Sequence, residues 1–256
     1  MPNRSHDNIA YLDGVRMKFG NEKFRNVFRD EAEQDRKRAA KLINTNIRFP
    51  SLFLLRPEIS KTYLYDSLSN KNRKALDISD EILTGKIDKA DHRQEEDREA
   101  LRWMLHSGYQ DDGMDEQYDQ VLDNAALLLS NVHKDKACLK PIVEILFNRH
   151  RKGLYTYDLI WAFFEASQPN DLLLIAEKLR SNHPRDVELA RSLLNFVPCI
   201  QVEANGGKQY KCCTKWIKRN LNRLHYTGET NQQHSNPMRY ALVEQNESTG
   251  GGETND

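Results

Sequence analysis

Residues 116–132 read EQYDQVLDNAALLLSNV, and this stretch decides the fold class. Its apolar positions return every three or four residues, at Tyr118, Val121, Leu122, Ala125, Ala126, Leu129 and Val132. That spacing places them on one face of an α-helix, where they can be buried against a neighbour. Further apolar segments, separated by short polar breaks, follow at 142–147, 159–164, 172–179 and 187–197. The pattern predicts a series of short helices that pack on one another.

The polar breaks carry residues that begin and end helices. Asp91 and Gln94 have the spacing of a capping box, and Gly108 is suited to end the helix that they open. Asp111-Asp112-Gly113 predicts a turn before the 116–132 helix, so the two helices should form an antiparallel hairpin. We therefore expect an all-α fold in which irregular helical hairpins stack as a short superhelix or bundle. Further helices should begin near residues 139, 157, 171 and 186.

Four segments are predicted along the chain. Residues 1–21 are polar, contain two glycines and should form a flexible N-terminal arm. Residues 22–90 should form an N-terminal helical segment, and residues 91–225 should form the helical-hairpin core. Residues 226–256 become rich in Gln, Asn, Ser, Thr and Gly, so we expect an extended, flexible polar tail.

The composition excludes several classes of protein. The 256 residues carry 38 basic and 38 acidic side chains, so the whole chain has no net attraction for nucleic acid or anionic lipid. No stretch approaches the ~18 apolar residues that a membrane-spanning helix requires, and the N-terminus lacks the apolar core of a signal peptide. Four cysteines do not make a disulfide framework. These features predict a cytoplasmic protein without a membrane span.

Two segments of the core resemble helical repeats. Leu139-Lys-Pro-Ile-Val-Glu-Ile-Leu146 looks like the second helix of a HEAT or armadillo repeat, with an early proline before an apolar stripe. Pro184-Arg-Asp-Val-Glu-Leu-Ala-Arg-Ser-Leu-Leu194 is similar to a first helix of the HEAT type. The resemblance covers about residues 116–198 and implies a scaffold that binds partners along a shallow surface, with no catalytic residues.

A second resemblance concerns the C-terminal part. Tyr210, Trp216-Ile217, Asn220, Tyr226-Thr-Gly-Glu229 and Ser235-Asn-Pro237 look like the C-terminal ends of proteins from spore-forming Gram-positive bacteria. This resemblance implies no activity.

A basic segment at 208–225 is the most distinctive predicted surface. Its apolar residues recur at helical spacing, so one face should be buried and the other should carry the charge. The charged residues are Lys208, Lys211, Lys215, Lys218, Arg219 and Arg223. This candidate basic interaction face is suited to phosphate groups or to an acidic partner. The alternative interpretation is a solvated face on the last helix of the domain.

An acidic counterpart lies earlier in the chain, within residues 91–123. The candidate acidic interaction face comprises Glu95, Glu96, Glu99, Asp111, Asp112, Asp115 and Glu116. Such a patch is suited to meet the basic segment, either in the same chain or in a neighbouring copy. A calcium loop is the alternative, but the spacing around Gly113 does not match an EF-hand.

The residue types that carry catalysis show no known arrangement. The eight histidines lie outside the His-Glu-x-x-His and Glu-x-x-His spacings, and the cysteines form no C-x-x-C pair. Thr84-Gly85-Lys86 lacks the upstream glycine of a phosphate-binding loop. The sequence therefore predicts no catalytic residue, no metal site and no cofactor.

Three hypotheses for function follow from these patterns. The favoured one is a non-enzymatic protein–protein interaction or assembly scaffold built from stacked helices, with another protein or copies of itself as partner. One alternative is a nucleic-acid-associated accessory protein that uses the basic helix 208–225. The other is a structural subunit of a larger homo-oligomer, in which the acidic segment of one copy meets the basic segment of the next.

Overall fold

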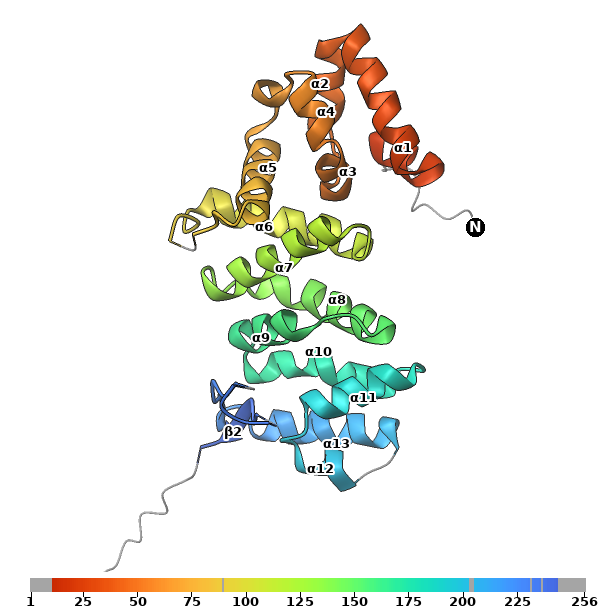
Figure 1. Cartoon of the computed structure of the whole chain (residues 1–256). Coiled ribbons are helices and arrows are strands. Elements are labelled where there is room, and N and C mark those ends of the chain that lie inside the picture. The colour runs from red at the N-terminus through yellow and green to blue at the C-terminus, as the bar shows by residue number, and fades with distance from the viewer. Residues whose placement is uncertain (1–10, 89, 203–204, 231, 236, 244–256) are drawn as a thin grey trace, which may run out of the picture. The chain divides into compact units, whose positions relative to one another are not determined.

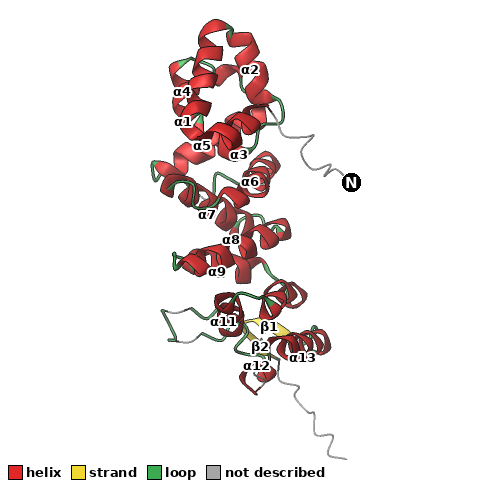
Figure 2. Cartoon of the chain, turned by 90° about the vertical axis from the view of Figure 1, so that its right-hand side faces the viewer, coloured by secondary structure: helices red, strands yellow, loops and turns green. Residues whose placement is uncertain are grey.

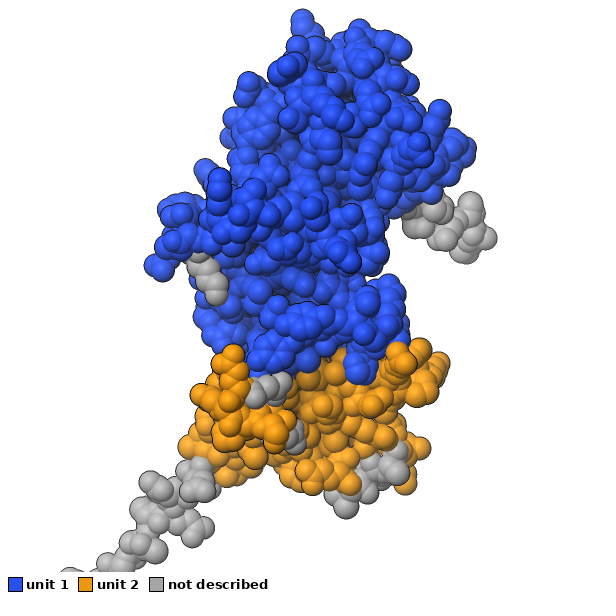
Figure 3. Space-filling view, viewed as in Figure 1, with its two compact units in different colours: residues 1–166 blue, residues 167–256 orange. Residues whose placement is uncertain are grey.

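The computed structural model describes residues 11–88, 90–202, 205–230, 232–235 and 237–243 (Figure 1). The chain divides into two compact units, residues 1–166 and residues 167–256, which Figure 3 colours separately. Within the described ranges the regular elements are helices, apart from one two-stranded sheet (Figure 2). The predicted all-α class is confirmed. The ends predicted to be flexible include residues 1–10 and 244–256, which lie outside the described ranges.

The first unit opens with helices that the sequence patterns only partly predict. These are α1 (Tyr11–Gln34), α2 (Arg36–Asn44), α3 (Phe49–Leu54), α4 (Arg56–Lys61), a 3-10 turn at Tyr65–Ser67 and α5 (Asn70–Leu83). Because α1 begins at Tyr11, it takes in half of the 1–21 segment for which a flexible arm was expected. Leu12 and Val15 are buried and hold this part of the helix to the fold. Gly20 has non-helical backbone angles, with φ +82°, and interrupts α1 with a kink at that point.

The second half of the first unit contains the predicted hairpin core. Its helices are α6 (Glu95–Gly108), α7 (Glu116–Asn131), α8 (Leu139–Lys152) and α9 (Tyr157–Ala166), with 3-10 turns at Tyr109–Asp111 and Lys136–Cys138. Figure 1 shows these four helices following one another as successive layers, and α7 packs against α5, α6 and α9. The predicted helix starts near 139 and 157 are confirmed.

The stripe on α7 is buried as its spacing predicted. Tyr118, Val121, Leu122, Ala125, Ala126 and Leu129 are all fully enclosed, whereas Val132 caps the helix and is half-buried. The capping box differs from the prediction, because Gln94 and Asp97 form it and the helix begins at Glu95. Gly108 ends α6 next to Tyr118, whose hydroxyl donates to the Gly108 carbonyl at 2.8 Å.

The second unit is made of shorter elements. They are a 3-10 turn at Pro169–Leu172, α10 (Leu173–Ala176), a 3-10 turn at Glu177–Arg180, α11 (Pro184–Leu193), α12 (Pro198–Val202), α13 (Gly206–Arg219), β1 (Leu224–Tyr226) and β2 (Tyr240–Leu242). The strands pair antiparallel, with Tyr226 opposite Tyr240. Tyr240 is buried and its hydroxyl donates to the Ser167 carbonyl at 2.9 Å. Part of the 226–256 segment, expected to be an extended tail, is therefore packed on the fold.

None of the described helices is both long enough and apolar enough to cross a membrane.

Candidate functional site

Helix α13 carries the predicted basic face, and the residues around it explain how it is held. Asn205 caps the helix by accepting from the Lys208 backbone N–H at 3.1 Å. Gly206 lies against the 3-10 turn at Glu177–Arg180. A Cβ added at Gly206 would come within 2.2 Å of the Leu179 carbonyl oxygen. Cys213 and Ile217 are buried on the inner face. Close approach at the N-terminus and apolar burial along the helix together turn its opposite face outward.

Five cationic side chains lie on the outward face, and we call them the α13 stripe. They are Lys208, Lys211, Lys215, Lys218 and Arg219, and all five are exposed. At 100° per residue they fall within a sector of about 100°, and the first and last lysines are about 15 Å apart along the axis. Within the described ranges no carboxylate forms an ion pair with any of them. The stripe is therefore a compact line of uncompensated positive charge.

Arg223, the sixth predicted residue, does not belong to the stripe. The helix ends at Arg219, because the Asn220 side chain donates to the Trp216 carbonyl at 2.8 Å and its backbone N–H bonds back into the last turn. Arg223 lies in the following turn and is half-buried, and its carbonyl oxygen accepts from the Val243 N–H at 2.7 Å. The predicted helix over 208–225 is thus too long, since Leu224 already belongs to β1.

A hollow of about 480 Å³ runs beside the stripe, lined by Tyr210, Lys211, Thr214, Lys215, Lys218 and Arg219. The Tyr210 hydroxyl donates to Glu177 at 2.6 Å, and this hydrogen bond lowers the pKa of the Glu177 carboxyl. The Arg180 guanidinium lies 4.4 Å from the centre of the Tyr210 ring. The guanidinium thereby covers one face of the Tyr210 ring. The groups in the hollow that are suited to bind a ligand are therefore mainly its cationic side chains and the Thr214 hydroxyl, and not an open aromatic face.

Buried Gln209 is a residue of this site that the sequence patterns missed. Its carbonyl accepts from Arg191 at 3.0 Å, and its amide donates to the Ile200 carbonyl at 3.0 Å. These bonds tie α13 to α11 and α12. The only signal in the sequence is a glutamine within the apolar face of a basic helix, four residues before Cys213.

The predicted acidic face does not form one surface. Asp111 pairs with Arg16 at 2.8 Å and with Arg48 at 2.9 Å. Asp112 is buried and pairs with Arg149 at 2.6 Å. Asp115 is the N-cap of α7 and accepts from two backbone N–H groups of its first turn. These three carboxylates therefore stabilise the first unit, and the arginines that pair with Asp111 and Asp112 are too distant in sequence for a local pattern to predict.

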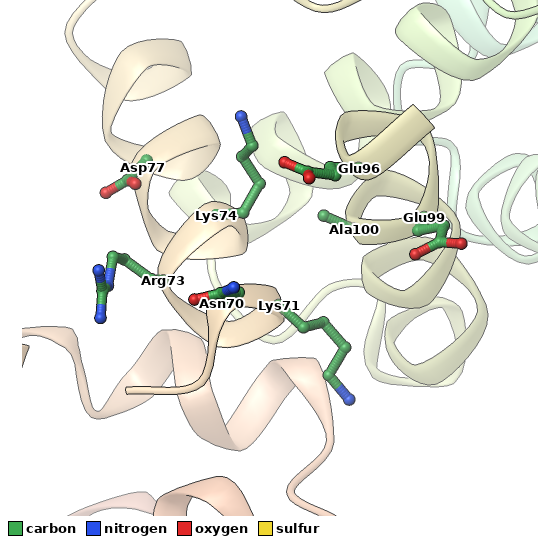
Figure 4. A pocket seen from close by; sticks show the side chains of 8 residues that line it. All are labelled: Asn70, Lys71, Arg73, Lys74, Asp77, Glu96, Glu99 and Ala100. Atoms are coloured by element: carbon green, nitrogen blue, oxygen red, sulfur yellow. The ribbon is translucent and has the colours of Figure 1, made fainter. Parts of the chain in front are cut away.

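The remaining acidic residues stay on the surface of the first unit. Glu95 accepts from Arg98 at 3.1 Å, and Glu116 is exposed in the first turn of α7. Glu96 and Glu99 line a groove of about 450 Å³ between α5 and α6, together with Asn70, Lys71, Arg73, Lys74, Asp77 and Ala100. In Figure 4 the Glu96 side chain points from α6 toward α5, where Lys74 stands opposite.

The charges in this groove are largely balanced within the chain. Lys74 pairs with buried Asp97 at 2.7 Å, and the Asp77 carboxylate accepts from the Tyr65 hydroxyl. Lys71 lies 4.2 Å from the centre of the Trp103 indole, and burial lowers the pKa of its amine. The groove is thus a mixed-charge surface, whereas the α13 stripe carries one sign of charge.

Across the described part of the chain, no three His, Cys, Asp or Glu side chains are arranged to hold a metal ion. Comparisons with protein-family models, curated proteins and solved structures find no match for the chain. The resemblance to HEAT and armadillo repeats therefore stays a prediction.

Proposed function

We propose that the protein is a non-enzymatic interaction or assembly protein that binds an anionic partner along the α13 stripe. The observation that supports this proposal is the line of five exposed cations without carboxylate partners in the described structure. Basic residues that serve only to keep a surface hydrated are usually interspersed with acidic residues. A helix face that carries only positive charge attracts negatively charged partners.

An acidic protein segment is the partner that the geometry favours. The lysines repeat at i, i+3, i+7 and i+10, so they form a straight row about 15 Å long. A carboxylate-rich helix or extended chain can lie along such a row and pair with several lysines at once. Each exposed pair contributes less than about 1 kcal/mol, so affinity would come from several pairs acting together.

Nucleic acid is the second candidate, and the charge of this part of the chain favours it. Residues 167–243 contain eleven lysines and arginines against six aspartates and glutamates. Because Arg180 covers one face of Tyr210, phosphate contacts would dominate over base stacking. Such binding would show little preference for base sequence.

One set of binding measurements tests both candidates. Fluorescence anisotropy would be recorded with a labelled poly-glutamate peptide and with a labelled DNA duplex of about 20 base pairs, at salt from about 50 to 300 mM. We expect the peptide to bind, and reversal of Lys211, Lys215 and Lys218 to Glu to abolish that binding. Tighter binding of the duplex would favour the second candidate. Absence of binding by both probes at the lowest salt would refute the proposal.

The matched control reverses three exposed lysines of the first unit, Lys23, Lys37 and Lys41, to Glu. This variant has the same net charge as the α13 variant. It should retain most of the affinity if the local stripe, and not the total charge, attracts the partner. Circular dichroism of both variants would show that the helices are intact.

A further inference from the structure

The segment that follows β2 has the opposite charge to the α13 stripe. Residues 244–256 contain Glu244, Glu247, Glu253 and Asp256, and they contain no lysine or arginine. The stripe has five cations in about 15 Å. The two charged sets belong to one unit of the chain.

The structure places Val243, the residue that precedes this segment, close to the end of α13. Val243 donates its backbone N–H to the Arg223 carbonyl at 2.7 Å, and Arg223 comes four residues after the last helical residue, Arg219. Pairing of β1 with β2 fixes this position, since Leu242 lies opposite Leu224. Val243, the residue before this segment, therefore lies near the C-terminal end of the stripe.

The segment is also long enough to follow the stripe. Thirteen residues span up to about 43 Å when extended, at about 3.3 Å per residue. Helix α13 has 14 residues and is about 21 Å long. The first acidic residues, Glu244 and Glu247, come early enough to meet Lys215, Lys218 or Arg219.

We propose that residues 244–256 bind the α13 stripe of the same chain and compete there with external anions. A tethered segment acts at an effective concentration that reaches the millimolar range, so even weak ion pairs can occupy the stripe. The docked segment is then an internal competitor that sets the affinity for partners. The competition, though not the docking, rests on the function proposed above.

Docking is tested without any partner by zero-length carbodiimide cross-linking of the whole protein, followed by mass spectrometry. Cross-links should join Glu244, Glu247 or Glu253 to Lys211, Lys215 or Lys218 at low salt, and they should disappear at about 0.5 M salt. Equal cross-linking of the tail to Lys23, Lys37 and Lys41 would overturn the proposal. So would links that join isotopically labelled to unlabelled chains, because the occupant would then be a second copy.

Competition is tested by neutralising the tail in the full chain, with Glu244→Gln, Glu247→Gln, Glu253→Gln and Asp256→Asn together. The poly-glutamate peptide should then bind about three- to tenfold more tightly at low salt. The matched control neutralises four exposed carboxylates of the first unit, Glu22, Asp30, Glu33 and Glu116, and should change affinity much less. An equal gain in both variants would overturn the competition.

The two proposals fail in different ways. Cross-links to the stripe, with no binding of either probe to the native protein or to the variant with the neutralised tail, would refute the proposed function and leave the docking intact. Binding of a probe without cross-links to the stripe would refute the docking and leave the proposed function intact.

Discussion

At the scale of single residues, buried polar groups join distant parts of the first unit. Asp13 is fully buried, and its carboxylate accepts from the Arg48 N–H at 2.9 Å and from the Ser51 hydroxyl. Arg16 donates to the same hydroxyl at 3.0 Å and to Asp111 at 2.8 Å. These bonds connect α1, α3 and the turn after α6. A search for apolar periodicity cannot find them, and this is why the helix at 11–21 was missed.

Replacing Asp13 by Ala tests this network. The change leaves the Arg48 N–H and the Ser51 hydroxyl without their buried acceptor, which should lower the free energy of unfolding by about 2–4 kcal/mol. Urea denaturation followed by circular dichroism measures the loss. Asp30→Ala, at an exposed position of the same helix, should cost less than about 0.5 kcal/mol. Similar losses for both variants would show that the network contributes little.

Gly206 allows the start of α13 to lie close to the 3-10 turn at Glu177–Arg180. Replacing Gly206 by Ala places a Cβ 2.2 Å from the Leu179 carbonyl oxygen, so the helix or the turn must move. We expect a destabilisation of about 1–3 kcal/mol, together with faster hydrogen exchange in the first turns of α13. Gly207→Ala is the matched control, since its Cβ would meet only the exposed Asn205 side chain, at 3.3 Å. Unchanged exchange in the Gly206 variant would contradict this account of the contact.

At the scale of helices and strands, the sequence patterns succeeded where burial is one-sided and continuous. The α7 stripe and the inner face of α13 were predicted because apolar side chains repeat at helical spacing over several turns. The end of α13 was misjudged, since Leu221 and Leu224 continue the spacing although the chain turns at Asn220. The strands were missed because three residues are too few to show alternation, and their pairing joins residues 14 to 18 positions apart in the sequence.

Helices α1 and α4 are joined by a charge pair that makes stability depend on pH. Arg29 donates to both Glu58 carboxylate oxygens, at 2.8 and 2.9 Å, and these hydrogen bonds lower the pKa of the buried Glu58. The unfolded chain keeps the ordinary value, so the pair stabilises the fold above about pH 4.5. That contribution is lost as the pH falls through the lowered pKa.

Glu58→Gln should therefore be less stable than the native protein at pH 7 and should lose less stability on acidification. The measurement is the urea midpoint at several values from pH 7 down to pH 3. Glu33→Gln, at an exposed position of α1, serves as the control and should follow the native curve. A Glu58→Gln curve parallel to the native one at every pH would rule out the assigned pKa shift.

At the scale of the whole molecule, the fold class could be predicted from the sequence, and so could one of the two charged surfaces. Short amphipathic segments separated by glycine, proline and capping residues are sufficient to predict an all-α chain. The basic face was predicted because it lies on one helix, where spacing defines direction. The acidic face was not, because pairing of Asp111 and Asp112 with arginines 37 to 95 residues away depends on the folded chain. A cluster of like charges in a sequence thus predicts a charged surface only where the residues belong to one helix or strand.

The most direct test of the central claim is the salt dependence of binding by the α13 stripe. The logarithm of the association constant would be plotted against the logarithm of salt concentration for the native protein and for a Lys211→Gln, Lys215→Gln, Lys218→Gln variant, with the poly-glutamate and duplex probes. The account predicts that the association constant of the native protein falls steeply as the salt concentration rises. In the variant the magnitude of this slope should be lower by about 2–3, roughly one per lysine removed. Equal slopes and equal affinities would contradict it, because the stripe would then make no contact with the partner.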